Sequence, residues 1–195
     1  MKRLLVTAGP TREMLDPVRF LSNVSTGEMG YQIAKAAKQK KYQVTLISGP
    51  TALPQPKGVR FVSVVSTKDM ERAVKRYFPK SDALIMTAAV CDYTPAKPSK
   101  QKIKRIQKKT VLFKRTNDIL KSISSGKGKR IVMGFCLETE DLEKNAIRKL
   151  REKDLDYIAA NAYNKSQNPF SCILLVTFPD FSLLQQVLLL YSSNL

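Results

Sequence analysis

The apolar residues of this sequence fall into short runs that alternate with helical patterns. The runs with the composition of buried strands are residues 4–8, 42–48, 60–65, 83–90, 130–135 and 155–160. The helical patterns between them predict helices at residues 29–41, 68–78, 117–124 and 140–153. Strands and helices that alternate in this way form βαβ units. The sequence therefore predicts an α/β fold with a doubly wound, mostly parallel, Rossmann-like sheet.

Three stretches interrupt this alternation. Residues 9–28 are rich in turn-forming residues, and the prolines of residues 49–56 indicate a loop. Residues 94–110 are the only candidate for a linker, followed by a short predicted strand at 111–113. We expect one domain over residues 1–195.

In a doubly wound sheet, ligands bind beyond the carboxyl ends of the strands, where the strand order reverses. The segments that this rule places at one edge are residues 9–30, 48–50, 86–93 and 135–139. We therefore look for function there.

The charge of the chain is strongly positive and unevenly distributed. The 195 residues include 34 Lys and Arg against 16 Asp and Glu, a net charge of +18. Nine of these basic residues and no acidic residue lie in residues 97–115, hereafter the basic segment. A block of like charges can be a solvated loop, a nucleic-acid contact or a clamp on a phosphorylated small molecule. Composition alone does not choose among the three.

The sequence contains no histidine, which excludes Ser-His-Asp and Cys-His nucleophiles and His-ligated metal sites. Cys91, Cys136 and Cys172 are far apart and form no C-x-x-C pair, which favours reduced intracellular thiols over disulfides. No apolar run approaches the length of a signal peptide core or a membrane span. We expect a cytoplasmic protein with no membrane contact.

Four features at the predicted edge have both a structural and a functional interpretation. The stretch Ser22 to Gly30 opens onto a helix and is either an ordinary cap or an anion site. Asp92 follows a buried strand and is a turn residue or a ligand-binding carboxylate. Phe135 is a core residue or a surface for a ligand ring. Lys149 and Lys153 share one helix face, solvated or functional. No G-x-G-x-x-G or phosphate-loop motif accompanies them.

Taken together, these segments resemble the phosphopantothenate–cysteine ligase family (phosphopantothenoylcysteine synthetase). The resemblance runs from Leu4 to about Asn161. It is carried by the segments 6–13, 15–20, 22–30, 48–50, 88–90, 92–93, 102–104, 134–135 and 138–139. The family's ligase domain is often fused to a flavin-dependent decarboxylase. No segment resembles that flavin domain, so we expect the stand-alone ligase, without flavin.

The resemblance implies a two-step reaction in coenzyme A biosynthesis. The carboxylate of 4′-phosphopantothenate attacks the α-phosphate of CTP, giving an acyl-cytidylate and pyrophosphate. The amine of L-cysteine then attacks the acyl carbon and releases CMP. Cations, amide donors and Mg²⁺ suffice for such chemistry. The resemblance also implies a homodimer, a separate phosphopantothenoylcysteine decarboxylase as a partner protein, and no nucleic acid.

The family's functional residues carry over to matching positions of this sequence. Asn23 and Lys102 match the catalytic asparagine and the lysine of a mobile loop. Arg19, Asn23 and Ala89 match substrate-binding positions. The positions that match the nucleotide site are Ser25, Thr26, Gly27, Met86, Thr87, Ala88, Asp92, Lys102, Asn117, Asp118, Ile119, Leu120, Phe135, Lys149 and Lys153. The resemblance assigns no metal ligand. The basic segment, within a flap over residues 94–116, is expected to cover the substrates and to serve as a dimerisation surface.

This sequence departs from the family pattern at several points. Glu28, Cys91 and Asn117 stand where lysine, alanine and proline are common. Residues 162–195 replace a Gly-Phe loop, a strand and an amphipathic helix with a divergent or shortened segment. One alternative is therefore a nucleotide-binding homologue with impaired catalysis. Another is a basic nucleic-acid-binding module, but such modules interleave aromatic with basic residues, and residues 97–112 contain no aromatic residue.

Overall fold

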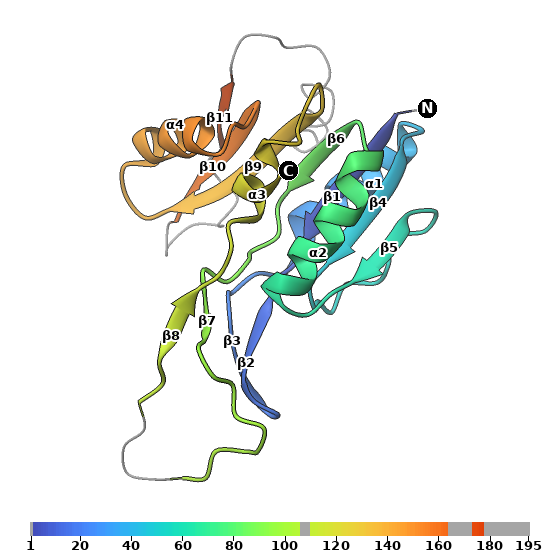
Figure 1. Cartoon of the computed structure of the whole chain (residues 1–195). Coiled ribbons are helices and arrows are strands. Elements are labelled where there is room, and N and C mark those ends of the chain that lie inside the picture. The colour runs from blue at the N-terminus through green and yellow to red at the C-terminus, as the bar shows by residue number, and fades with distance from the viewer. Residues whose placement is uncertain (1, 106–109, 164–172, 178–195) are drawn as a thin grey trace.

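The computed structural model describes residues 2–105 and 110–163, together with the backbone of residues 173–177. Seven strands form the main sheet in the order β11-β10-β9-β6-β1-β4-β5 (Figure 1). Their bounds are β1 Arg3–Ala8, β4 Gln43–Ser48, β5 Arg60–Ser63, β6 Ala83–Met86, β9 Ile131–Glu138, β10 Tyr157–Ala162 and β11 Ile173–Thr177. The first six strands run parallel, and β11 pairs antiparallel with β10. The predicted α/β, Rossmann-like class is confirmed.

Helices cover both faces of the sheet. Their bounds are α1 Glu28–Gln39, α2 Thr67–Tyr77, α3 Ile119–Ser124 and α4 Leu142–Glu152, with a 3₁₀ turn η1 at Phe78–Lys80. The buried residues of α1 pack on one face, and those of α2, α3 and α4 pack on the other. Ser66 and Asp69 form a reciprocal capping box that starts α2, which explains why the helix begins at Thr67.

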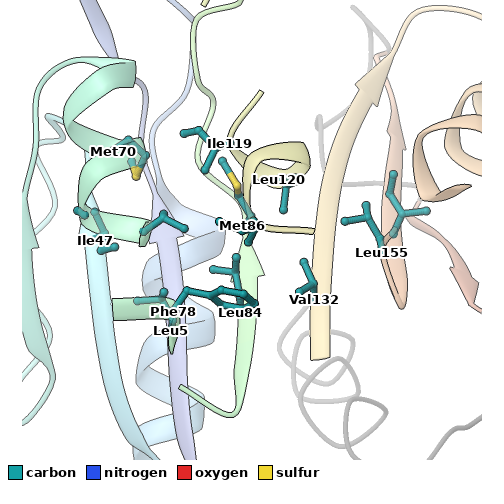
Figure 2. Packing of buried hydrophobic residues seen from close by; sticks show 14 of the residues in the cluster. Leu5, Ile47, Met70, Phe78, Leu84, Met86, Ile119, Leu120, Val132 and Leu155 are labelled. Carbon is teal, nitrogen blue, oxygen red and sulfur yellow. The ribbon is translucent and has the colours of Figure 1, made fainter. Parts of the chain in front are cut away.

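The core follows from strands whose central positions are mostly apolar. Leu5 points to the face covered by α2, while Leu4 and Val6 point to the face covered by α1. In Figure 2, Leu5, Leu84 and Val132 from the neighbouring strands β1, β6 and β9 lie around the same layer of side chains. Burial on both faces is why these runs show no polar alternation.

The strand order reverses between β1 and β6. From β1 the chain builds outward through β4 to β5, and it then returns through α2 to add β6, β9 and β10 on the other side. The loops that follow β1 and β6 therefore diverge at the carboxyl edge of the sheet. This is the position at which doubly wound sheets bind ligands.

Two antiparallel hairpins extend from this edge and correct the sequence prediction. The stretch 9–28, predicted as turns, contains β2 (Arg12–Asp16) and β3 (Arg19–Ser22). A second hairpin pairs β7 (Tyr93–Pro95), which was not predicted, with β8 (Phe113–Arg115). β2 packs beside β7, so both hairpins lie on the same side of the edge (Figure 1).

Several boundaries also differ from the prediction. The run 83–90 leaves the ladder after Met86, because the following backbone turns to bridge Pro10 through Ala89. β9 continues to Glu138, three residues beyond its prediction, because β10 pairs with it along its whole carboxyl half. The short strand predicted at 111–113 begins at Phe113 instead. The segment 162–195, expected to be divergent or shortened, contains β11, and the parts of that prediction on residues 164–172 and 178–195 lie outside the described residues.

Gly30 fixes how closely α1 approaches the sheet. A Cβ atom at this position would lie 2.5 Å from the Ala8 Cβ and 2.6 Å from the Thr87 Oγ1. We expect Gly30→Ala to lower the free energy of unfolding by about 1–3 kcal/mol, since overpacking outweighs the better helix propensity of alanine. Gly126→Ala is the matched control, because its Cβ would have no neighbour nearer than 3.8 Å. Urea unfolding followed by circular dichroism measures both; equal losses would contradict the close approach.

Candidate active site

Three glycines bring the loops at the carboxyl edge into contact. Gly9 and Gly27 adopt φ values of +71° and +82°, which only glycine accepts without strain. A Cβ on Gly27 would lie 3.0 Å from the Gly9 Cα, and one on Gly49 would lie 1.8 Å from the Pro10 carbonyl oxygen. The turn before α1, the end of β1 and the end of β4 are thus packed backbone against backbone.

The first turn of α1 has no side-chain cap. Gly27 occupies the N-cap position, and only the Glu28 N–H has a nearby hydroxyl, the Thr26 Oγ1 at 3.3 Å. The N-terminus of a helix attracts anions because its first N–H groups lack intrahelical partners. Ser25 is half-buried and Thr26 is exposed beside this turn. The predicted positions Ser25, Thr26 and Gly27 therefore do lie where an anion can approach backbone donors.

A network of hydroxyl groups connects α1 to the loop that follows β4. The Tyr31 hydroxyl donates to Ser48 Oγ at 3.2 Å and accepts from Thr51 Oγ1 at 3.0 Å. Ser48 Oγ in turn donates to the Gly49 carbonyl oxygen at 2.8 Å. The segment 48–50, singled out in the sequence, acts here as a support for the glycine contacts.

Asn23 connects the first hairpin to the loop after β6. Its Nδ2 donates to the carbonyl oxygens of Ala89 at 3.0 Å and Val90 at 2.9 Å. Both hydrogens of the amide are therefore used in this state, and Oδ1 is its remaining polar atom. The predicted catalytic Asn23 and substrate-binding Ala89 are thus direct neighbours, although they are far apart in the sequence.

The loop after β6 is held by hydrogen bonds to β1, and it leaves the Asp92 side chain exposed to solvent. Thr87 Oγ1 donates to the Thr7 carbonyl oxygen at 2.7 Å, and the Ala88 N–H donates to Thr7 Oγ1 at 3.2 Å. The Met86 side chain is buried in the core, so only its backbone can meet a ligand. The Asp92 side chain is exposed, while its carbonyl oxygen accepts the Thr116 N–H at 2.9 Å.

Lys149 of α4 and Lys153, the C-cap residue of that helix, reach the carboxyl edge through ion pairs. Lys153 Nζ lies 2.9 Å from Asp118 Oδ2, and Lys149 Nζ lies 2.5 Å from Glu138 Oε1. Asp118 also caps α3 by accepting the Lys121 N–H. Burial raises the pKa of Asp118, but the Lys121 N–H and Lys153 outweigh it, so the pKa lies below its usual value. These contacts join β9, α3 and α4.

Other predicted nucleotide-site side chains near α3 point into the protein. Ile119 and Leu120 are buried in the core, and Phe135 packs against the cluster under α1. Asn117 Nδ2 donates to Glu71 Oε2 at 3.2 Å, so its amide is directed at α2. Only the backbone of 119–120 and an edge of Phe135 remain for a ligand.

Lys102 and Arg19 share a cationic cavity of about 750 Å³. Its lining residues are Leu15, Arg19, Lys102, Ile103, Lys104, Arg105 and Val111. Four of these carry positive charge and none is acidic, so the cavity suits an anion. It lies between the first hairpin and the basic segment, because Arg19 Nη2 donates to the Ile103 carbonyl oxygen at 2.6 Å.

Sequence reasoning missed a buried polar cluster under the hairpins. Thr11 Oγ1 lies 2.9 Å from Thr67 Oγ1 and accepts the Cys91 N–H at 2.9 Å, while Glu13 Oε1 accepts the Thr67 N–H at 2.7 Å. Burial raises the pKa of the Cys91 thiol, so Cys91 is a structural thiol at neutral pH. Polar residues at alternating positions, Thr11 and Glu13, were the available signal.

Metal-binding and membrane-spanning features are not evident in the described part of the chain. Residues 2–105 and 110–163 contain no group of three or more His, Cys, Asp and Glu side chains able to hold a metal ion. Over the same residues, no helix is both long and apolar enough to cross a bilayer.

Comparison with known proteins identifies relatives along most of the chain. The family model of the DNA/pantothenate metabolism flavoprotein C-terminal domain matches residues 1–173. The coenzyme A biosynthesis bifunctional protein CoaBC of Bacillus subtilis (strain 168) is 49% identical over 162 residues, covering 82% of this chain and 40% of that protein. Its counterpart from Escherichia coli (strain K12) is 39% identical over 173 residues, covering 86% and 43%. The chain thus spans less than half the length of these relatives.

Solved structures share the fold. The crystal structure of the C-terminal domain of a CoaBC protein has a TM-score of 0.75 and 37% identity, and the match covers 99% of this chain and 93% of that one. A Cab2 mutant in complex with phosphopantothenate-cysteine has a TM-score of 0.73, covering 99% of this chain and 85% of that one. At 15% identity, the latter shows the fold alone.

The sheet defines an α/β protein of the Rossmann-like class, with Asn23 and Ala89 in contact at its carboxyl edge and a cationic cavity at the hairpin that extends from this edge. Within that class, the chain belongs to the DNA/pantothenate metabolism flavoprotein C-terminal domain family.

Proposed function

We propose that this chain catalyses the CTP-dependent condensation of 4′-phosphopantothenate with L-cysteine in coenzyme A biosynthesis. The observation that carries the proposal is the composition of the carboxyl edge. An uncapped helix N-terminus and the Asn23 amide lie at this edge, and a cavity with four cations lies between the basic segment and the hairpin that extends from the edge. The names of the relatives, CoaBC proteins of coenzyme A biosynthesis, support the same pathway.

In the first proposed step, the carboxylate oxygen of phosphopantothenate attacks the α-phosphorus of CTP. The bond from that phosphorus to the bridging oxygen breaks, and pyrophosphate leaves. Negative charge grows on the phosphoryl oxygens, so catalysis depends on fixed positive groups. Lys102 is proposed to contact the reacting groups directly, and Arg19 to bind the anionic substrate in the same cavity.

In the second proposed step, the amine of cysteine attacks the acyl carbon. The carbonyl oxygen gains negative charge, the bond to CMP breaks, and the amine loses a proton as the amide forms. We propose that Asn23 exchanges one of its two backbone acceptors for this oxygen. Its N–H then stabilises the charge as an oxyanion-hole donor does.

The nucleotide is proposed to lie along the carboxyl edge of β6 and β9. The backbone of 86–88 and of 117–120 would contact the base, Asp92 would accept the ribose hydroxyls, and Phe135 would lie beside a ring. Phosphate binding by Lys149 and Lys153 requires these lysines to leave Glu138 and Asp118 for the nucleotide. Asp118 stays partly exposed to solvent when Lys153 leaves it, whereas Glu138 is mostly buried, so the charge of the nucleotide phosphates must compensate for breaking its pair with Lys149.

Magnesium is proposed to enter with the triphosphate. Mg²⁺ in nucleotide sites is usually held by phosphates, waters and one or two carboxylates rather than by a protein cage. The described residues fit this, because they contain exposed carboxylates such as Asp92 but no preformed acidic cluster. The ion would neutralise charge on the leaving pyrophosphate.

The hairpins are proposed to bind a second copy of the chain. Large apolar side chains are exposed along them, which monomers rarely show as a group. They are Met14, Val18, Phe20, Leu21, Tyr93, Leu112 and Phe113. A solution mass equal to one chain of 21.9 kDa in light scattering would contradict the dimer.

The test of the proposed function is pyrophosphate release from CTP, ATP and UTP, each with and without 4′-phosphopantothenate. We expect release only when phosphopantothenate is present, fastest with CTP, and amide formation after cysteine is added. Binding of CTP without release would favour the impaired homologue. A preference for ATP would overturn the assignment of the nucleotide while retaining the ligase reaction.

A further inference from the structure

Asp16 is a fully buried carboxylate at the tip of the first hairpin, and the proposed chemistry does not use it. None of its side-chain surface is exposed. Its Oδ1 accepts the N–H groups of Val18 and Arg19, both at 2.9 Å. Its Oδ2 accepts Arg19 Nε at 2.9 Å and the Ile103 N–H at 3.0 Å, and it also pairs with Arg19 Nη2.

The local backbone explains why an aspartate points inward here. The register of β2 and β3 shifts between Met14 and Asp16, which is the mark of a bulge at Leu15. The bulge directs the Leu15 carbonyl oxygen outward, where it accepts the Ser99 N–H at 2.9 Å. The Asp16 carboxylate then stabilises the hairpin turn by accepting the N–H groups of Val18 and Arg19.

The same contacts attach the basic segment to the hairpin. Ile103 donates its N–H to Asp16, and its carbonyl oxygen accepts Arg19 Nη2 at 2.6 Å. Ser99, four residues before Ile103, is held by the hydrogen bond of its N–H to the Leu15 carbonyl oxygen. Lys102 and Lys104 flank Ile103, so the backbone that carries both lysines is fixed on the hairpin.

Charge reinforces this arrangement. The Arg19 guanidinium, opposed by burial but aided by three backbone N–H groups, holds the pKa of Asp16 well below its usual range. The Asp16 carboxylate therefore carries a negative charge at neutral pH. It pairs with Arg19, one of the four cations that line the cavity and repel one another.

We infer that Asp16 is a positioning residue that acts through Arg19 and Ile103 to hold Lys102 at a fixed place in the cationic cavity. The inference rests on the proposed function for its catalytic part. Its structural part, a basic segment that is clamped rather than free over residues 99–103, stands on the contacts alone. A displaced Lys102 loses rate because positioning errors of about 1 Å can cost about 100-fold.

The first experiment compares Asp16→Asn with Asp82→Asn. Asp82 is a matched control, because it also accepts a backbone N–H and a guanidinium, both from Arg3, at the opposite edge of the sheet. Limited trypsin digestion of the folded proteins is followed by mass spectrometry. We expect Asp16→Asn to lose protection after Lys100, Lys102, Lys104 and Arg105, with no change in Asp82→Asn. Equal cleavage of wild type and Asp16→Asn would overturn the clamp, whether or not the protein is a ligase.

The second experiment is a double-mutant cycle on pyrophosphate release. We expect Asp16→Asn to slow the first step by about 10- to 100-fold in wild type. In the Lys102→Gln background it should have no further effect, because it acts through that lysine. An equal fold-loss in both backgrounds would show a merely structural role and overturn the inference. If no nucleotide supports release in wild type, the proposed function fails, and the digestion still decides on the clamp.

Ile103→Pro is the second variant for the digestion experiment if Asp16→Asn does not fold. This variant removes the N–H that Asp16 accepts, together with the isoleucine side chain, at a half-buried position outside the core. It should show the same loss of protection after Lys100, Lys104 and Arg105, because trypsin does not cleave between Lys102 and a proline. Retained protection would overturn the clamp.

Discussion

Replacing Lys102 with glutamine is expected to slow pyrophosphate release by about 100- to 1,000-fold, the usual cost of one group that stabilises transition-state charge. Lys102 lines the cationic cavity, and its flanking backbone is held by Arg19 and Asp16. Glutamine is one bond shorter than lysine and can donate a hydrogen bond, but it carries no charge. A single-turnover assay with CTP and phosphopantothenate measures the step, and CTP binding should change far less than the rate.

The matched control is Lys100→Gln. It makes the same charge change two residues away, in the same basic segment, on a side chain that does not line the cavity. We expect it to retain the wild-type rate within about twofold, as for exposed charges screened by solvent. Equal losses in the two variants would mean that only the overall charge of the segment matters. Full turnover by Lys102→Gln would remove the assigned role.

The sheet was predictable because the central positions of its strands are mostly apolar. Leu4, Leu5 and Val6 are all buried, so the run can only be a strand covered on both faces. Alternation with helices then limited the topology to a doubly wound sheet. The carboxyl edge followed from that topology, and Asn23 and Ala89 do meet there.

The first hairpin could not be recognised in the same way because its pattern is inverted. Its buried side chains are polar, Glu13 and Asp16, while Phe20 and Leu21 are exposed. Periodicity rules assume that the buried side is apolar. Here the inward positions are polar because they cap α2 and hold the basic segment, which no local pattern reveals.

The side-chain orientations at the proposed nucleotide site could not be predicted from the sequence either. The resemblance brings Asn117 and Ile119 to the site, but the amide of Asn117 bonds Glu71 and Ile119 fills the core. A motif fixes which backbone approaches the edge. Which atoms remain available depends on packing partners that lie far away in the sequence.

Replacing Asn23 with aspartate is expected to slow the second step by about 100- to 1,000-fold, as loss of one oxyanion donor does. A carboxylate cannot donate, so it loses both contacts to Ala89 and Val90 and repels their carbonyl oxygens. It would also repel the acyl oxygen as that atom gains charge. The first step develops its charge on the α-phosphate, so it should be slowed much less. Acyl-cytidylate should therefore accumulate.

Rapid-quench analysis of the bound intermediate, chased with cysteine, separates the two steps in Asn23→Asp. Asn145→Asp is the matched control, because its amide also donates to a backbone carbonyl, that of Glu140 at 3.1 Å, near the start of α4. It introduces the same charge and should leave both steps unchanged. If Asn23→Asp slows both steps equally, the amide supports the loop after β6 rather than the acyl oxygen. If it slows neither, the Asn23 contacts to that loop have no part in catalysis.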